Sequence, residues 1–248
     1  MRVFGDISYC DMAHPKQTLD IYLPDADEFP VFIYFHGGGL EGGSKEKRFL
    51  HEFAEKGIAV VSANYRMYPS AVFPEFIRDA AAAVAWTHKN IQKYGKATKF
   101  FVGGSSAGGY LSQMLCFDKK YLAPYGIDPA KIDGFIHDAG QPTVHFNILR
   151  ERGMSTDRIV VDEAAPLYFV GKDPEYAPML IIVSDQDIPC RYEQTMLLMT
   201  ALKQFKYDPD KIELRVEQGK HCEYCRKKTA DGGNMFVHIA SSYILNKL

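Results

Sequence analysis

A serine in a glycine-rich turn is the feature of this sequence best suited to chemistry. The segment 103–109 reads GGSSAGG, and within it Gly104, Ser106 and Gly108 have the spacing G-x-S-x-G. The strand-like run KFFV precedes the turn and the helix-like run AGGYLSQMLCF continues from it. A strand-to-helix turn of this kind holds its serine in strained backbone geometry, and glycines flank the serine because larger neighbours would clash. We predict that Ser106 is a nucleophile and that Ser105 is out of register.

A second glycine-rich turn lies upstream. His36, Gly37, Gly38 and Gly39 directly follow the apolar run VFIYF. Consecutive glycines leave backbone N–H groups unobstructed, and together with the N–H of Ala107 such groups can bind the oxyanion of a tetrahedral intermediate. We therefore expect an oxyanion hole here, with His36 anchoring the turn. A phosphate-binding loop is the alternative for the serine turn, but that turn lacks the lysine such a loop needs.

A general base and its orienting acid are expected at the ends of later strands, with the acid first. The run MLIIV leads to Asp185 and Asp187, and the run KIELRVEQ leads to His221. We predict that His221 is the base. Asp187 is the preferred acid because it lies farther past its strand, near the turn at Pro189, and Asp185 is the alternative. The other histidines of the later chain are not expected to take part: His51, His88, His137, His145 and His238.

These residue types, in this order, fit one reaction cycle. Ser106 attacks an acyl carbonyl, and His221 removes its proton and later protonates the leaving group. Asp187 fixes the imidazole tautomer and stabilises the imidazolium. We therefore expect a hydrolase that works through an acyl-enzyme and needs neither a metal nor another cofactor.

The rest of the chain alternates short apolar runs with amphipathic stretches, which indicates an α/β protein with a mostly parallel sheet flanked by helices. Segments 4–9 and 19–23 alternate in polarity and predict an antiparallel N-terminal edge. Buried strands are predicted from continuous apolar runs over 31–35, 58–63, 100–102, 132–136, 179–183 and 212–216. Helices are predicted over 74–94, 107–117, 191–205 and 234–245.

One segment interrupts this alternation. Residues from about 140 to 178 have mixed polarity, several charges and several prolines. We interpret the segment as a small lid above the strand ends, and an ordinary long connection with a short helix is the alternative. Because no repeat, linker or composition boundary is visible, residues 1–248 are expected to form a single domain.

Composition narrows the class of protein. The 248 residues carry a net charge of −2 and no dense basic run, so nothing indicates nucleic-acid binding. The N-terminus lacks the apolar core of a signal peptide, and no stretch approaches the roughly 20 apolar residues of a membrane helix. Five cysteines include the pair Cys222 and Cys225 but not the second pair that a structural zinc site usually needs. We expect a cytoplasmic protein that contacts neither membrane nor nucleic acid.

With these residues identified, the chain resembles the bacterial carboxylesterases related to hormone-sensitive lipase and the neighbouring acetyl-esterase branch, which is similar to acetylxylan esterases. The resemblance runs from LDIYLP at residues 19–24 to the C-terminus. It rests on the HGGG run, on NYR at residues 64–66, on the serine turn, and on Asp187 and His221. It implies an α/β-hydrolase fold.

The resemblance also implies roles for particular residues. In that family the second and third glycines of the HGGG run donate to the oxyanion, which assigns Gly38 and Gly39 to that role beside Ala107. Arg66 is expected to be structural and to pair with Asp79. HGGG begins by residue 36, earlier than in most of the family, so we expect a small cap or none. The loop HCE at residue 221 replaces the HGF that is frequent in the family.

For function, the resemblance implies hydrolysis of short-chain carboxylic esters, with acetyl groups on a sugar or a small alcohol as the expected substrates. An arylformamidase-like amide hydrolase would share the fold, the HGGG-type loop and the three catalytic residues. A ligand-binding relative without catalysis is less consistent with the sequence, because every catalytic position is filled. A peptidase is also less consistent, since such enzymes usually carry a further domain.

Overall fold

The computed structural model describes residues 1–11 and 14–248. Its centre is one eight-stranded sheet in the order β1-β2-β4-β3-β5-β6-β7-β8. Strand β2 is antiparallel to both β1 and β4, and the neighbours from β4 to β8 along the sheet are parallel. The strands are β1 (Arg2–Ser8), β2 (Thr18–Leu23), β3 (Glu28–Phe35), β4 (Ala59–Ala63), β5 (Lys96–Ser105), β6 (Gly134–Asp138), β7 (Met179–Gln186) and β8 (Ile212–Lys220).

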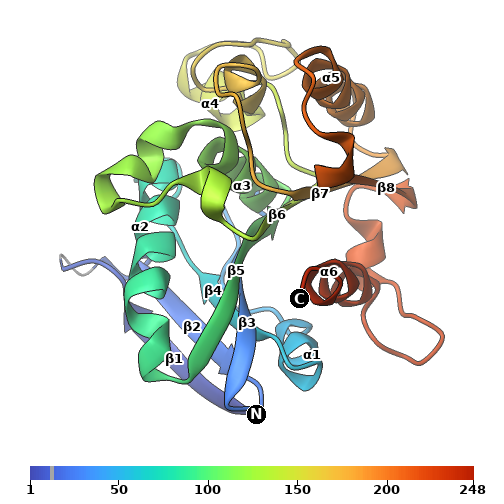
Figure 1. Cartoon of the computed structure of the whole chain (residues 1–248). Helices are drawn as coiled ribbons and strands as arrows, with labels where there is room; N and C mark the ends of the chain where they lie inside the picture. The colour runs from blue at the N-terminus through green and yellow to red at the C-terminus, as the bar shows by residue number, and fades with distance from the viewer. Residues whose placement is uncertain (12–13) are drawn as a thin grey trace.

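Helices cover both faces of this sheet (Figure 1). The helices are α1 (Leu50–Glu55), α2 (Glu75–Asn90), α3 (Ala107–Phe117), α4 (Phe146–Glu151), α5 (Arg191–Gln204) and α6 (Met235–Leu245). Helices α2, α3 and α5 pack with one apolar cluster on one face, while α1 and α6 pack with a second cluster on the other. The parallel sheet, its antiparallel N-terminal edge and the four predicted helices are confirmed. The strand predicted as buried over 212–216 is instead the edge strand β8, in which no residue is fully buried, because it has a neighbouring strand on one side only.

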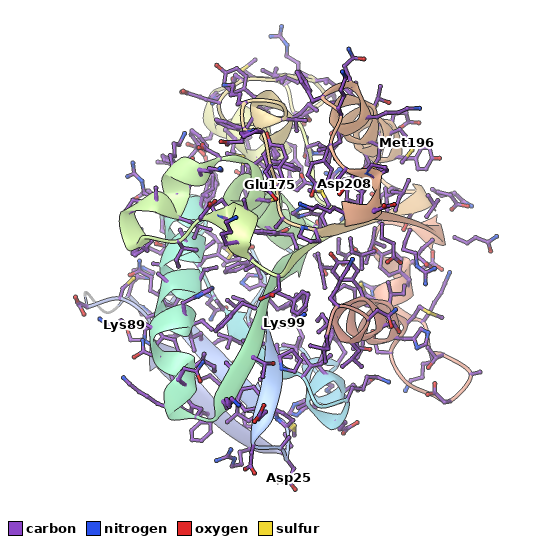
Figure 2. The ribbon with its side chains drawn as sticks, viewed as in Figure 1. Asp25, Lys89, Lys99, Glu175, Met196 and Asp208 are labelled. Atoms are coloured by element: carbon purple, nitrogen blue, oxygen red, sulfur yellow. The ribbon has the colours of Figure 1, made fainter. Side chains whose placement is uncertain are left out.

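The most buried elements are those whose sequences are apolar all round. In β3, every residue from Phe29 to Phe35 is buried, as expected for a parallel strand covered on both faces. In α3, every residue is buried, because the helix lies directly behind the central strands β5 and β6. Figure 2 shows side chains filling the space between the sheet and its helices, with Asp25 and Lys89 at the outer edge. The central position of β5 and α3 makes the turn between them a rigid platform.

Most strand boundaries differ from the predicted ranges, and in β5 and β6 the reason is visible in the strand pairing and the turns. The structure extends β5 back to Lys96, although its first residues are polar, because it pairs there with β3. Strand β6 begins at Gly134, two residues later than the predicted run 132–136. Asp133 ends the preceding turn, and its carboxylate accepts the Phe100 N–H at 2.8 Å.

The segment between β6 and β7 contains α4 and the short 3-10 helix η5 (Pro166–Phe169). Both α1 and α4 are six residues long and were not predicted as separate helices. Among the described residues, no helix combines the length and apolar character needed to cross a membrane.

Candidate active site

The turn between β5 and α3 holds Ser106 in unusual backbone geometry. Its φ is 57° and its ψ is −112°, a combination that a non-glycine residue adopts only when its surroundings enforce it. A Cβ on Gly108 would lie 1.9 Å from the carbonyl oxygen of Phe35, and a Cβ on Gly104 would lie 2.4 Å from the same atom. The two glycines of the G-x-S-x-G pattern are therefore required by the close approach of β3 to the turn.

The three residues predicted to act together meet at the carboxyl ends of β5, β7 and β8. The Ser106 Oγ lies 2.8 Å from Nε2 of His221, and Nδ1 of His221 lies 2.5 Å from Oδ1 of Asp187. Ser106 and His221 are partly exposed, whereas the carboxylate of Asp187 is fully buried. A serine, a histidine and a buried carboxylate in this chain can carry out nucleophilic acyl transfer.

The acidic partner is Asp187, and the alternative Asp185 faces elsewhere. Asp185 accepts the backbone N–H of Gly219 at 2.8 Å and makes no contact with the histidine ring. Asp187 also accepts the N–H groups of Ile188 and Ser184. These contacts hold its carboxylate in place while one oxygen faces His221.

Ser105 points away from the histidine. Its side chain is buried and accepts a hydrogen bond from the Tyr34 hydroxyl at 3.2 Å. The two adjacent serines therefore lie in different surroundings, and only Ser106 faces His221.

The charge on Asp187 sets the electrostatics of the site. Burial lowers the pKa of His221, but the hydrogen bonds and negative charges of Asp187 and Cys222 outweigh this effect, and the pKa of the imidazole is raised above its ordinary value of 6.5. The pair therefore stabilises a protonated imidazole, which is the form that follows attack by a serine.

The HGGG turn lies against the serine. A Cβ on Gly37 would come within 3.1 Å of the Ser106 Cβ. Gly38 has a φ of 130°, and a Cβ on it would overlap the Gly42 carbonyl oxygen at 2.0 Å. Among the described residues, the backbone N–H groups of Gly38 and Gly39 donate no hydrogen bond. With the N–H of Ala107 at the start of α3, they are the donors that remain for an oxyanion.

His36 anchors this turn, as expected. Its ring stacks on Tyr65 with centroids 4.5 Å apart, and its Nδ1 lies 2.8 Å from the Gly37 oxygen. The Tyr65 hydroxyl donates to the His36 carbonyl oxygen at 2.8 Å. Burial lowers the pKa of His36 to about 4, so the ring is neutral near pH 7.

Helix α4 holds the other side of the turn, which sequence reasoning did not foresee. The Asn147 side chain donates to the Gly39 oxygen at 2.9 Å and to the Glu41 carboxylate at 3.3 Å. Arg150 pairs with the same carboxylate at 2.5 Å. Phe146 covers Gly39, since a Cβ there would lie 3.1 Å from its ring. The segment before β7 therefore folds back onto the proposed oxyanion hole.

Most of the polar side chains near α4 hold the segment together. His145 caps α4 by accepting the Asn147 N–H. Arg152 pairs with Asp162 at 2.7 Å. Gln141 instead lines a cavity of about 420 Å³ beside the loop that carries Asp187, whereas His145, Asn147, Arg150 and Arg152 do not line it.

Two thiols and a carboxylate gather beside the triad. Cys222, Cys225 and Asp138 bring their ligand atoms within 4.8 Å of one another, and across the described residues no other group of three or more such side chains meets this criterion. Burial raises the pKa of Asp138 to about 6, and Tyr224 donates its hydroxyl to the carboxylate. These ligand types suit a soft divalent ion, but a structural zinc site would need a fourth ligand.

A serine on a strand-to-helix turn, followed in the chain by an acid and a histidine at the ends of later parallel strands, defines the α/β-hydrolase class. The sequence matches the BD-FAE family over residues 19–128 and the prolyl oligopeptidase family over residues 74–232. The second match covers more than half of the chain, so the chain belongs to the prolyl oligopeptidase family of α/β-hydrolases.

Individual relatives place the chain with the esterases of this class. It is 28% identical to esterase LipC of Mycobacterium tuberculosis over 76% of this chain and 53% of LipC. It is 32% identical to probable carboxylesterase 6 of Arabidopsis thaliana over 62% of this chain and 48% of the relative. The chain thus spans about half the length of these relatives. The expected kinship with carboxylesterases related to hormone-sensitive lipase is confirmed.

Solved structures confirm the fold. Esterase B from Lactobacillus rhamnosis superimposes with a TM-score of 0.79 at 17% identity, covering 99% of this chain and 86% of that one. A truncated carbohydrate esterase from gut microbiota gives a TM-score of 0.76 at 17% identity, covering 100% and 96%. The α/β-hydrolase fold expected from the sequence is therefore present along the whole chain.

Proposed function

We propose that this protein is a serine esterase that hydrolyses short-chain carboxylic esters, acetyl esters of carbohydrates among them, through an acyl-enzyme on Ser106. The observation that carries the proposal is the continuous hydrogen-bonded chain from Ser106 through His221 to Asp187, with distances of 2.8 and 2.5 Å. The esterase relatives support the reaction class.

In the proposed mechanism the Ser106 Oγ attacks the ester carbonyl while Nε2 of His221 takes its proton. The N–H groups of Gly38, Gly39 and Ala107 stabilise the negative charge that develops on the carbonyl oxygen. The imidazolium then protonates the departing alcohol. Water, activated by the same histidine, attacks the acyl-enzyme and releases the acid. None of these steps requires a metal or another cofactor.

The preference for short acyl groups is supported by the space beside the triad. Phe146 closes over the glycine turn, and the adjoining cavity of about 420 Å³ mixes apolar and charged walls. A long apolar chain would gain about 0.8 kcal/mol for each methylene it buries, but the charged Asp157, Arg158 and Arg191 in these walls disfavour burying such a chain. The likeness to a carbohydrate esterase supports a sugar as the alcohol.

A panel of p-nitrophenyl esters from acetate to decanoate tests the proposal, with acetylated oligosaccharides and N-formylkynurenine as further substrates. We expect kcat/KM to be highest at acetate to butyrate and to fall for longer chains. A maximum at octanoate or beyond would contradict the short-chain preference. Faster turnover of N-formylkynurenine than of every ester would replace the esterase with a formamidase.

A further inference from the structure

The cavity beside the triad has a charged wall. It opens between the segment that carries α4 and the loop that follows Asp187. Two guanidinium groups, those of Arg158 and Arg191, line it, and Asp157 is the one acid among its lining residues. The remaining wall is apolar or neutral and includes Phe146, Ile159, Ile188, Pro189 and Gln194. A ligand in this space therefore meets more positive than negative charge.

Arg191 is buried, and among the described residues it has no directly ion-paired carboxylate. It is 3% exposed, and its guanidinium donates to the Ala139 carbonyl oxygen and to Oε1 of Gln141, both neutral acceptors. In the part of the chain that the structure describes, no carboxylate forms an ion pair with it within 4.0 Å. The nearby carboxylate of Asp187 is already bonded to His221. Burying a charge without a partner is costly, and burial lowers the pKa of Arg191 to about 10.

Two further features add positive charge to the same wall. Arg158 is exposed, and across the described residues its guanidinium has no hydrogen-bonded or ion-paired partner. Helix α5 begins at Arg191, and the Cys190 side chain at its N-cap forms no capping hydrogen bond. Cys190 also lines the cavity, so the positive end of this 14-residue helix adjoins the cavity.

We propose that this cavity binds a carboxylate carried by the substrate, so that the preferred substrates are esters with a free carboxylate on their acyl or alcohol part. The inference rests on the proposed esterase function, because Ile188, which lines the cavity, directly follows the proposed acid Asp187 in the chain. A guanidinium matches a carboxylate with two parallel hydrogen bonds, and a bound carboxylate would supply the counter-charge that Arg191 lacks. Arg158 at the rim would attract the anion and close on it.

Matched substrate pairs test the proposal through kinetics. The first pair is 4-acetoxybenzoate and 4-acetoxybenzamide, and the second is monomethyl succinate and methyl succinamate. Each pair keeps the ester and changes only a carboxylate to a carboxamide. We expect kcat/KM to favour the carboxylate by about tenfold in at least one pair, because charge-assisted hydrogen bonds are about twice as strong as neutral ones. Higher salt should lower this ratio.

Three variants separate recognition from structure. Arg158→Gln and Arg191→Gln should each lower the carboxylate-to-carboxamide ratio several-fold. Arg152→Gln is the matched control: Arg152 lies in the same segment, pairs with Asp162 and does not line the cavity, so the ratio should be unchanged. If Arg191→Gln does not fold, Arg158→Gln alone tests the carboxylate-binding proposal. A wild-type ratio of one or less in both pairs, or a ratio that neither variant changes, would overturn the proposal.

A binding measurement distinguishes this inference from the esterase proposal. Calorimetry on Ser106→Ala measures affinity for both members of each pair without turnover. Tighter binding of the carboxylate, lost in Ser106→Ala/Arg158→Gln, supports the carboxylate site even if the wild type hydrolyses none of the esters. Equal affinity for carboxylate and carboxamide in both pairs contradicts the site whatever the activity of the wild type.

Discussion

At the scale of single residues, the account depends on His221 being neutral when Ser106 attacks. Because Asp187 raises the pKa of His221 above 6.5, the imidazole stays protonated to a higher pH than a free histidine. A protonated imidazole cannot accept the serine proton, so kcat/KM should rise with pH and reach half its plateau above pH 6.5. The pH profile of acetyl-ester hydrolysis measures this midpoint.

Substituting Asp187 tests what raises the pKa of His221. In Asp187→Asn the midpoint should fall, because the carboxylate that stabilises the imidazolium is gone, and kcat should drop by about 10⁴-fold. Asp185→Asn is the control, since that carboxylate bonds only to the Gly219 N–H. An unchanged midpoint in Asp187→Asn, or an equal shift in Asp185→Asn, would show that the wrong acid has been assigned.

At the residue scale, a sequence pattern is most informative where the steric constraint is local. The spacing of Gly104, Ser106 and Gly108 identifies the strained serine, since the clash that requires glycine arises within the turn and its neighbouring strand. For the acid, the sequence favours Asp187 over Asp185, but it does not show the geometry behind this choice. It depends on a register shift between Ser184 and Gln186, where β7 stops following β8 regularly. Strand alternation alone does not reveal such a shift.

At the scale of elements, α4 fixes the position of the glycine turn. Asn147→Ala removes the donor to the Gly39 oxygen and should lower kcat by about tenfold, less than the 10²–10³-fold that follows loss of an oxyanion donor itself. The loss should fall on kcat more than on KM, because a loosened turn stabilises the transition state less well. Steady-state kinetics on a short-chain ester measures both constants.

Arg150→Ala is the matched control for this positioning role. Arg150 lies in the same helix but contacts only the exposed Glu41 carboxylate, with side chains 46% and 43% exposed. Its loss should change kcat by less than about threefold, as expected for an exposed ion pair. Equal losses in the two variants would mean that α4 acts as a whole and that Asn147 has no particular role.

Neither α4 nor α1 could be found from the sequence, for a physical reason. A six-residue helix completes fewer than two turns, too few for a periodic apolar face. Their stability comes from tertiary contacts, such as those of buried Leu50 and Phe53 in α1. That residues 140–178 act as a lid stays a prediction, although their packing onto the glycine turn is consistent with one.

At the scale of the whole molecule, Asp79 ties the N-terminal edge of the sheet to α2. Its buried carboxylate accepts hydrogen bonds from the Arg66 side chain and backbone and from the Gln17 amide. The structure thus contains the pairing of Arg66 with Asp79 that the sequence predicts. Asp79→Ala leaves these donors unpaired and should cost about 3–5 kcal/mol of unfolding free energy. Urea unfolding measures the loss.

An exposed ion pair is the control for this stability prediction. The side chains of Glu28 and Lys96 are 57% and 67% exposed, so Glu28→Ala should cost under about 1 kcal/mol. A similar loss of unfolding free energy in the two variants would mean that the buried hydrogen bonds of Asp79 stabilise the fold no more than an exposed ion pair does.

The sheet could be predicted as a whole because its central strands are short apolar runs that alternate along the chain with amphipathic helices. The contacts that cross the molecule could not. The Asp138 carboxylate at the end of β6 accepts a hydrogen bond from the Tyr224 hydroxyl. Arg191 at the start of α5 donates hydrogen bonds to Ala139 and Gln141, which follow β6. No local pattern marks such pairs, since each forms only once the strands lie side by side.

The central claim is that Ser106 is the nucleophile, and labelling with an organophosphonate ester tests it most directly. Mass spectrometry of the digested protein should find one adduct per chain, on the peptide that contains Ser106, with ester hydrolysis lost in proportion to labelling. Ser106→Ala should take up no label, whereas Ser105→Ala should still be labelled, because Ser105 faces Tyr34 rather than His221. An adduct on Ser105 or elsewhere, or hydrolysis that survives in Ser106→Ala, would contradict the account.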